Sequence, residues 1–180
     1  SSATASVTVG GCFEGWDDTE VSLGDSSYIF VGETAGDKAG YSVSGAGDVD
    51  GDGLGDLLIG ANYESSGGTY AGATYLVLGS SLRSTSEIDL GDADYVFIGE
   101  SDSHYSGDSV SSAGDVDGDG LDDILVGAWA EDTGGSYAGA AYLVLGSSLG
   151  DSVEIDLSDA DYKLVGESAY DMAGQHVSSA

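Results

Sequence analysis

Apolar residues in this chain come in short runs bounded by glycine, serine and aspartate. Four runs between residues 41 and 99 predict strands. Tyr41–Gly45 alternates apolar and small polar residues, Asp56–Ala61 carries a continuous apolar run, and Ala73–Gly79 and Tyr95–Gly99 are rich in β-branched and aromatic residues. None of these runs keeps helical spacing over ten residues. The pattern therefore predicts an all-β fold.

This pattern recurs with a period of 67 residues. Two segments each occur three times, Leu23–Thr34 again as Leu90–Ser101 and Leu157–Ser168, and Ala39–Ala46 again as Ser106–Ala113 and Ala173–Ala180. Four short strands in each period predict β-propeller blades of four antiparallel strands. A β-solenoid and a sandwich of two duplicated sheets are the structural alternatives, although solenoid coils are usually much shorter than this period.

The period also divides the chain. We expect an N-terminal segment at 1–22 and a propeller segment at 23–180, with full repeats at about 41–99 and 108–166. Partial repeats at both ends predict a leading strand at Tyr28–Val31 and a trailing strand at Val177–Ser179. Because propellers need about four to eight blades, we expect an incomplete ring, which belongs either to a longer chain or to an assembly of several copies.

Antiparallel pairing predicts which loops lie together. Alternate connections emerge on the same side, so the turn between strands one and two shares a face with the connection 79–94. The loops 62–70 and 99–107 then lie on the opposite face. Five aromatic residues are expected on this face, where they form an interaction surface or pack between neighbouring blades; packing is favoured for the two that recur in phase, Tyr70 and Tyr137. The residues concerned are Tyr63, Tyr70, Tyr105, Trp129 and Tyr137.

The turns between strands one and two crowd aspartates at alternate positions. Counted from the first aspartate, carboxylates occupy positions 1, 3, 5 and 9 of each turn, and the backbone carbonyl at position 7 is a natural further ligand. A glycine at position 6 permits the sharp turn that brings position 9 back. The predicted metal ligands are Asp48, Asp50, Asp52, Leu54 and Asp56 in the first turn and Asp115, Asp117, Asp119, Leu121 and Asp123 in the second.

This oxygen-only, multi-anionic set favours Ca²⁺, about one ion in each turn. Mg²⁺ prefers to keep several waters, and Zn²⁺ would find no cysteine or histidine in either turn. An EF-hand is excluded because position 12 is Ile59 or Val126 and a strand follows. The alternative is an acidic, solvated turn without metal, against which the identical phasing of the two copies argues.

Composition narrows the choice of partners. The chain has 33 acidic and 3 basic residues, a formal charge of −30, which excludes nucleic acid and anionic membrane and points to cations or high salt. With 41% hydrophobic residues it still has enough apolar surface to fold. No run reaches the roughly 18 apolar residues that a membrane span needs.

The remaining reactive side chains predict no catalytic site. His104 and His176 occupy different phases of the repeat, so both are interpreted as surface histidines. Asp18 and Asp122 fit no ligand position and are interpreted as surface charge. We therefore expect no enzymatic activity.

Three other residues have a weaker interpretation. Lys38 and Lys163 are expected to relieve local acidic repulsion. Cys12 ends the stretch "VGGC", which faintly resembles a lipoprotein attachment box but has no apolar stretch before it. The role of Cys12 stays open.

Together, the repeat and its "DxDxDGxxD" turn resemble the FG-GAP repeat of the integrin α-subunit propeller and its bacterial or archaeal relatives, over about 23–180. The resemblance implies Ca²⁺ at the eight aspartates of the two turns. The chain departs from the motif's namesakes, with Ala39-Gly40 and Ser106-Gly107 in place of "FG".

The function that follows is an extracellular or cell-surface, calcium-binding propeller segment. It would serve as a binding or adhesion module for a protein or glycan ligand, with structural Ca²⁺. The alternative is a structural subunit of a self-assembling extracellular filament or surface layer, in which copies of the chain pair with one another.

Overall fold

The structure is a computed structural model that describes residues 4–5, 26–83 and 86–179. It is all-β, as predicted, with only short 3₁₀ turns between the strands. The strands are β1 (Thr4–Ala5), β2 (Ile29–Val31), β3 (Ser42–Gly47), β4 (Asp56–Ala61), β5 (Ala73–Val77), β6 (Glu87–Asp89), β7 (Tyr95–Ile98), β8 (Ser109–Gly114), β9 (Asp123–Ala128), β10 (Ala140–Val144), β11 (Glu154–Asp156) and β12 (Tyr162–Val165). The expectations about Cys12 and Asp18 lie outside the described residues.

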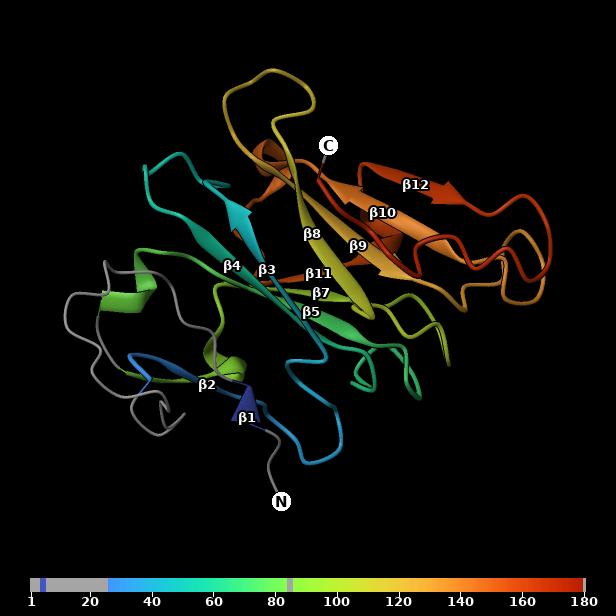
Figure 1. Cartoon of the computed structure of the whole chain (residues 1–180), viewed down its shortest axis with the longest axis horizontal. Coiled ribbons are helices and arrows are strands. Elements are labelled where there is room, and N and C mark those ends of the chain that lie inside the picture. The colour runs from blue at the N-terminus through green and yellow to red at the C-terminus, as the bar shows by residue number, and fades with distance from the viewer. Residues whose placement is uncertain (1–3, 6–25, 84–85, 180) are drawn as a thin grey trace, which may run out of the picture.

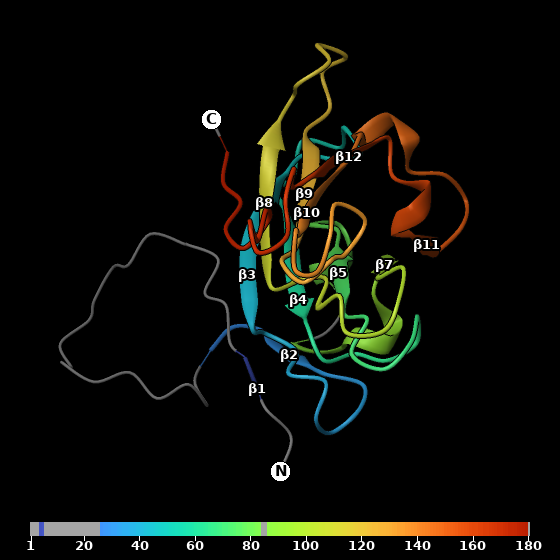
Figure 2. The ribbon, with the colours of Figure 1, turned by 90° about the vertical axis from the view of Figure 1, so that its right-hand side faces the viewer.

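Two blades of four antiparallel strands form the centre of the molecule (Figure 1). The first has the order β3-β4-β5-β7 and the second the order β8-β9-β10-β12, so the prediction of four-stranded antiparallel blades is confirmed. Figure 2 shows β3 and β8 together on one side of the molecule, with β7 and β11 on the other. The described strands form no closed ring.

A fifth short strand in each period was not predicted. β6 pairs in parallel with β2, and β11 pairs in parallel with β7, so each joins the outer edge of the preceding sheet. The sequence pattern predicts only a connection over residues 79–94. Each of these strands has only three residues, Glu-Ile-Asp, with only the isoleucine partly buried, so it leaves no periodic pattern. Its partner is far away in sequence, and only the packing of the blades brings the two together.

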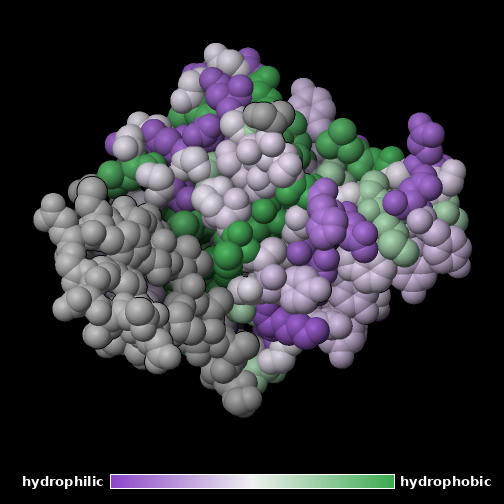
Figure 3. Space-filling model, viewed as in Figure 1, coloured by the Kyte–Doolittle hydropathy of each residue, from purple (hydrophilic) through white to green (hydrophobic). Residues whose placement is uncertain are grey.

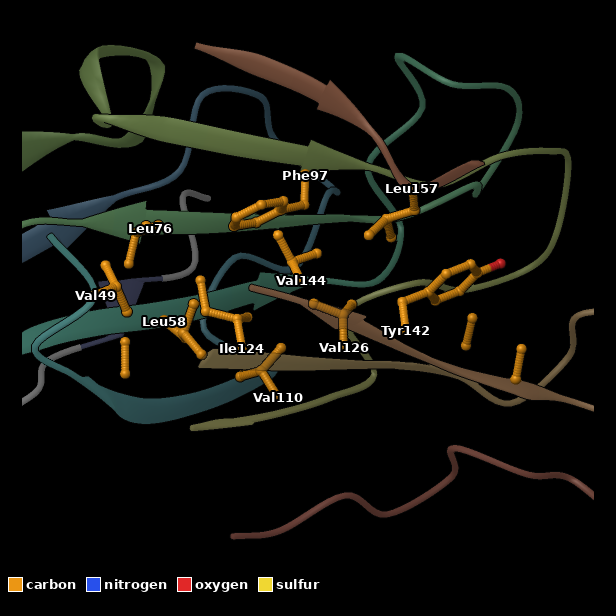
Figure 4. Close-up of a cluster of buried hydrophobic side chains, with 13 residues drawn as sticks. Val49, Leu58, Leu76, Phe97, Val110, Ile124, Val126, Tyr142, Val144 and Leu157 are labelled. Atoms are coloured by element: carbon orange, nitrogen blue, oxygen red, sulfur yellow. The ribbon is translucent and has the colours of Figure 1, made fainter. Parts of the chain in front are cut away.

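The main core lies between the two blades (Figure 4). Alternation along the strands sends Leu58 and Leu76 to this interface and Leu57 and Ile59 to the other face of the first blade, where Phe30 of β2 covers them. Both faces of the first blade are therefore buried, which explains the continuous apolar run in β4. The largest side chains between the blades are Val49, Leu58, Leu76, Phe97, Val110, Ile124, Val126, Tyr142, Val144 and Leu157.

The loops separate onto two ends as predicted. The β3–β4 and β8–β9 turns project at the top of Figure 1, and the β4–β5 and β7–β8 loops lie at the lower right. At the first end, the N–H of Gly79 after β5 donates to Asp56 at 2.8 Å, which places this connection beside the aspartate turn.

Two other features complete the description. The trailing strand expected at Val177–Ser179 is wrong: these residues form no strand, and the N–H of Val177 donates to the Ser109 hydroxyl at 3.0 Å. The equivalent segments one and two periods earlier, β8 and β3, each pair with the strand that follows them. Among the described residues, no helix is long and apolar enough to cross a membrane.

Candidate metal sites and the opposite loop face

The first aspartate turn connects β3 to β4 and gathers three carboxylates. Oxygen atoms of Asp48, Asp50 and Asp56 lie within 4.8 Å of one another. Gly53 at position 6 has φ 83°, a left-handed conformation that costs a residue with a side chain free energy. The turn that brings position 9 back to positions 1 and 3 therefore depends on this glycine.

Hydrogen bonds within the turn hold the carboxylates in place. Asp48 Oδ2 accepts from the N–H of Gly53 at 3.0 Å, and Asp50 Oδ1 accepts from the N–H of Asp52 at 3.0 Å. The other oxygen of Asp48, Oδ1, is buried and has no hydrogen-bond partner among the described residues. A buried carboxylate oxygen without a donor is unfavourable unless a cation is close, so this atom suits a metal ligand.

The second turn, between β8 and β9, repeats the arrangement. Oxygen atoms of Asp115, Asp117 and Asp123 lie within 4.8 Å of one another, and Gly120 at position 6 has φ 96°. Asp115 Oδ2 accepts from the N–H of Gly120 at 3.0 Å, as Asp48 does from Gly53. The chain thus builds the same group of three carboxylates twice, although Asp115 Oδ1, unlike Asp48 Oδ1, accepts from the N–H groups of Gly118 and Asp119.

The aspartate at position 9 also anchors the backbone. Asp56 accepts from the N–H groups of Val49 and Gly79, both at 2.8 Å, and is 2% exposed. Asp123 does the same with Val116 at 2.8 Å and Gly146 at 2.9 Å. Burial raises the pKa of the Asp56 carboxyl, although its two backbone hydrogen bonds oppose the rise. A nearby cation would favour its charged form.

Position 5 differs from the other predicted positions. Asp52 and Asp119 stand outside the two groups of three carboxylates, and their Oδ1 atoms accept from the N–H groups of Leu54 and Leu121 at 2.8 Å. Ligation by Asp52 and Asp119 and by the two leucine carbonyls stays a prediction. Three clustered carboxylates in each turn supply hard, anionic oxygen atoms, the kind of ligand that hard divalent cations bind.

Asp122 has a role that the sequence interpretation missed. It is not simply surface charge: its Oδ2 accepts from the N–H of Asp48, in the other blade, at 2.8 Å. Its own N–H donates to the Asp48 carbonyl at 3.0 Å. The two aspartate turns are therefore joined. Only the packing of the blades creates this contact.

The interpretation of His104 as a surface residue is also wrong, because it is 7% exposed. It lies on the opposite loop face near Glu100 and Glu131, two acids that bracket Lys163 at 2.7 and 3.1 Å. The expectation that Lys163 relieves acidic repulsion is confirmed. Burial opposes ionisation of Glu131, but hydrogen bonds from Thr133 and Lys163 outweigh it and lower its pKa. In the sequence, the signal that could have revealed this buried acid is its repetition: Glu131 recurs one period earlier as Glu64.

Aromatic side chains on this loop face form one continuous stack that crosses both blades. Tyr105 stacks on Tyr70 and on Trp129, with ring centroids 6.2 and 5.5 Å apart. Trp129 continues to Tyr137 at 5.7 Å, and Tyr137 to Tyr170 at 5.8 Å. Tyr70 and Tyr137 pack against neighbours and still remain 44% exposed, so packing and surface exposure are both realised. We call these rings, together with Tyr63, the aromatic stack.

The backbone of the aromatic stack is unusual. Tyr70, Tyr105, Tyr137 and Tyr170 all have φ between 55° and 69°. Residues with side chains adopt this conformation infrequently, and strained positions of this kind cluster at binding sites. At one end, the Lys38 ammonium lies 3.5 Å from the ring centroid of Tyr63.

Comparison with known proteins agrees with this architecture. Residues 39–77 and 106–144 match the family described as FG-GAP repeat. These segments contain β3 to β5 and β8 to β10, each with its aspartate turn.

Similar proteins include three animal integrin α subunits. "Integrin alpha pat-2" of Caenorhabditis briggsae is 35% identical over 103 residues, and its Caenorhabditis elegans counterpart is 35% identical over 99 residues. "Integrin alpha-PS5" of Drosophila melanogaster is 33% identical over 126 residues. The matches cover 55% to 68% of this chain but only 8% to 11% of those proteins. The bacterial or archaeal type of repeat in our expectation stays a prediction.

Proposed function

Because the chain carries two FG-GAP repeats in the form of propeller blades, we propose that it is a calcium-binding segment of an extracellular or cell-surface binding and adhesion module. The observation that carries the proposal is the pair of equivalent aspartate turns. Each gathers three carboxylates, and the first leaves a buried Asp48 oxygen without a donor. The proposal includes no catalytic activity.

Calcium would have a structural role in this segment. The residues that would hold it are Asp48, Asp50 and Asp56 in one turn and Asp115, Asp117 and Asp123 in the other, with Asp52, Asp119 and the carbonyls of Leu54 and Leu121 as further ligands. Two ions would change the formal charge from −30 to −26. The remaining charge would still favour saline surroundings, where screening limits self-repulsion.

The ligand would bind at the opposite loop face. The aromatic stack lies there, and aromatic residues are enriched at protein interfaces. Stacked neighbours cover the ring faces of Trp129 and Tyr137, so open ring faces remain chiefly at the ends of the stack. A sugar that packs on an open ring face would find fewer such faces here, so a protein ligand fits better than a glycan. The similarity to integrin α subunits supports the same choice.

Calorimetric titration with Ca²⁺ tests the calcium proposal. We expect two ions per chain, one fewer in either Asp50→Ala or Asp117→Ala, and none in the double variant. Binding of fewer than two ions by the unmodified chain, or full binding by the double variant, would contradict the proposal. Retention of chain-coated beads on extracellular matrix under flow, with Ca²⁺ and with EDTA, then tests adhesion, and equal retention in both would count against a calcium-dependent module.

A second candidate is the structural subunit of an assembly, which the outer face of the second blade favours. Val116, Tyr162 and Leu164 are 52%, 60% and 56% exposed there, and Figure 3 shows hydrophobic residues at the surface over β12. One period earlier, the equivalent Val49 and Phe97 are fully buried beneath the second blade. In the first blade, β11 pairs with the outer edge of β7. β12 is the equivalent strand of the second blade, and no described strand pairs with its outer edge.

The occupant of this face would be a second copy of the chain, whose Glu-Ile-Asp strand would pair with β12 as β11 pairs with β7. Sedimentation velocity over a range of concentrations tests this candidate. We expect reversible association that Leu164→Asp abolishes while Leu164→Phe, which restores the residue of the first repeat, preserves it. A concentration-independent monomer would eliminate the candidate.

A further inference from the structure

A second group of possible metal ligands lies on the loop face, away from the aspartate turns. Glu100 follows β7, His104 belongs to the β7–β8 loop, and Glu131 belongs to the β9–β10 loop. One ligand atom from each of the three lies within 4.8 Å of the other two. The group therefore sits where the two blades meet, and it includes the only buried histidine of the described residues.

Two atoms of the group lack partners. Glu131 is 1% exposed and His104 is 7% exposed. Glu131 Oε2 and His104 Nδ1 are both buried and have no hydrogen-bond partner in the part of the chain that the structure describes. Since buried polar atoms are nearly always bonded, two unbonded atoms in one cluster point to a partner that binds both.

The charge of the group favours a cation. Glu100 and Glu131 supply two negative charges, and the Lys163 ammonium, 2.7 and 3.1 Å from them, supplies one positive charge. With a neutral imidazole the cluster keeps one net negative charge in a poorly hydrated place. Lys163 binds Glu131 through Oε1 and leaves Oε2 unused.

The orientation of His104 leaves a nitrogen available. Its Nε2 lies 3.6 Å from Asp132 Oδ1, an exposed carboxylate at the edge of the cluster. A histidine that coordinates a metal through one ring nitrogen commonly donates the N–H of its other ring nitrogen to a carboxylate. Nδ1 is the nitrogen that lacks a partner.

We propose that Glu100, His104 and Glu131 form a site for a divalent metal ion of the Zn²⁺ class, separate from the calcium turns. One imidazole nitrogen and two carboxylates match the mixed donors that Zn²⁺ accepts, whereas Ca²⁺ and Mg²⁺ take oxygen alone. Lys163 is the competing cation. Its side chain is 25% exposed, so it can withdraw to solvent when metal binds.

The first repeat provides natural comparison residues. One period earlier, the positions of Glu100 and Glu131 are Glu33 and Glu64, but His104 is replaced by Asp37 and Lys163 by Val96. The first repeat thus keeps the carboxylates without the imidazole or the lysine. The proposed site therefore does not recur one period earlier, and His104→Asp with Lys163→Val converts it to the form found there.

The test titrates the full chain with ZnCl₂ in saturating millimolar Ca²⁺, which keeps the aspartate turns occupied. The sequence holds one other histidine and one cysteine, so the parent protein carries His176→Gln and Cys12→Ser. We expect the parent protein to bind one Zn²⁺ per chain. His104→Gln or His104→Asp should weaken the affinity for Zn²⁺ at least about tenfold, and Lys163→Val should strengthen it. Asp50→Ala with Asp117→Ala should leave Zn²⁺ binding unchanged.

Tryptophan fluorescence gives a second measurement. Trp129 lies two residues before Glu131, and its ring stacks at 5.5 Å on that of Tyr105, the neighbour of His104. In a Trp16→Phe background, Cu²⁺ should quench Trp129, and His104→Gln should remove the quenching. No Zn²⁺ bound by the parent, or unchanged affinity in a His104→Gln variant that melts at the parent's temperature, would overturn the proposal. If His104→Gln does not fold, the same criterion applies to His104→Asp.

Discussion

Asp48 and Asp122 form a reciprocal pair of hydrogen bonds between the two blades. The N–H of Asp48 donates to Asp122 Oδ2 at 2.8 Å, and the N–H of Asp122 donates to the Asp48 carbonyl at 3.0 Å. Asp48 is position 1 of the first aspartate turn, and Asp122 directly precedes position 9 of the second. An ion that orders one turn would therefore help to order the other.

This pair predicts coupling between the two turns. Asp122→Ala removes the acceptor for the Asp48 N–H, and we expect a loss of about 1–3 kcal/mol in the free energy of unfolding. Calcium binding at the two turns should also become independent in titration calorimetry. Asp151→Ala, which removes an exposed carboxylate, is the control for the loss of one negative charge. An equal effect in both variants would show that the hydrogen bonds between Asp48 and Asp122 do not couple the two turns.

Calcium should raise the melting temperature through the aspartate turns. A ligand that binds only the folded state at a hundred times its Kd stabilises it by about 2.7 kcal/mol. Asp50→Ala or Asp117→Ala should each remove part of the calcium-induced rise, and the double variant should remove it. Thermal melting in Ca²⁺ and in EDTA measures this, with Asp159→Ala as the control; a full rise in the double variant would place the ions elsewhere.

Position 9 should matter even without metal. Each oxygen of Asp56 accepts a backbone N–H, from Val49 and from Gly79. Asp56→Asn replaces one carboxylate oxygen by an NH₂ group, which faces a backbone N–H and cannot accept its hydrogen bond. We therefore expect the free energy of unfolding in EDTA to fall by about 1–3 kcal/mol. Asp50→Asn keeps its one accepting oxygen and should change stability little. Urea unfolding of the two variants separates the roles, and similar losses in both would contradict this assignment.

Lys163 should stabilise the blade interface. Lys163→Met leaves Glu131, which is 1% exposed, without its counter-charge, and an unpaired buried carboxylate is costly. Because Lys163 itself is partly exposed, we expect a loss of about 1–3 kcal/mol in chemical unfolding. Lys163→Met combined with Glu131→Gln should recover part of this loss. No recovery in the double variant would show that the lysine acts by packing alone.

The aromatic stack should depend most on its central ring. Tyr105 contacts Tyr63, Tyr70 and Trp129, whereas the terminal Tyr170 stacks only on Tyr137. Each ring pair contributes about 0.5–1.5 kcal/mol beyond burial, so Tyr105→Ala should destabilise the chain more than Tyr170→Ala. Tyr105→Phe keeps the ring and should remain close to the unmodified chain. Equal losses from Tyr105→Ala and Tyr170→Ala in urea unfolding would show that the rings do not act as one stack.

The sequence by itself determined the blades and the aspartate turns. The alternation in Ser42–Gly47, the apolar run in Asp56–Ala61 and the glycine at position 6 are local signals, since strand periodicity and turn conformation depend on neighbouring residues. Repetition after 67 residues made each of these signals stronger. The sequence also predicted which loops lie at each end of the molecule, because connections between antiparallel strands emerge alternately at the two ends of a sheet.

Only the tertiary structure decided what happens between the blades. The pairing of β11 with β7, the contact between Asp48 and Asp122 and the burial of His104 join segments from different blades. The aromatic stack likewise combines rings from four loop segments. None of these contacts has a local pattern, because each depends on the spacing and the rotation between two packed sheets.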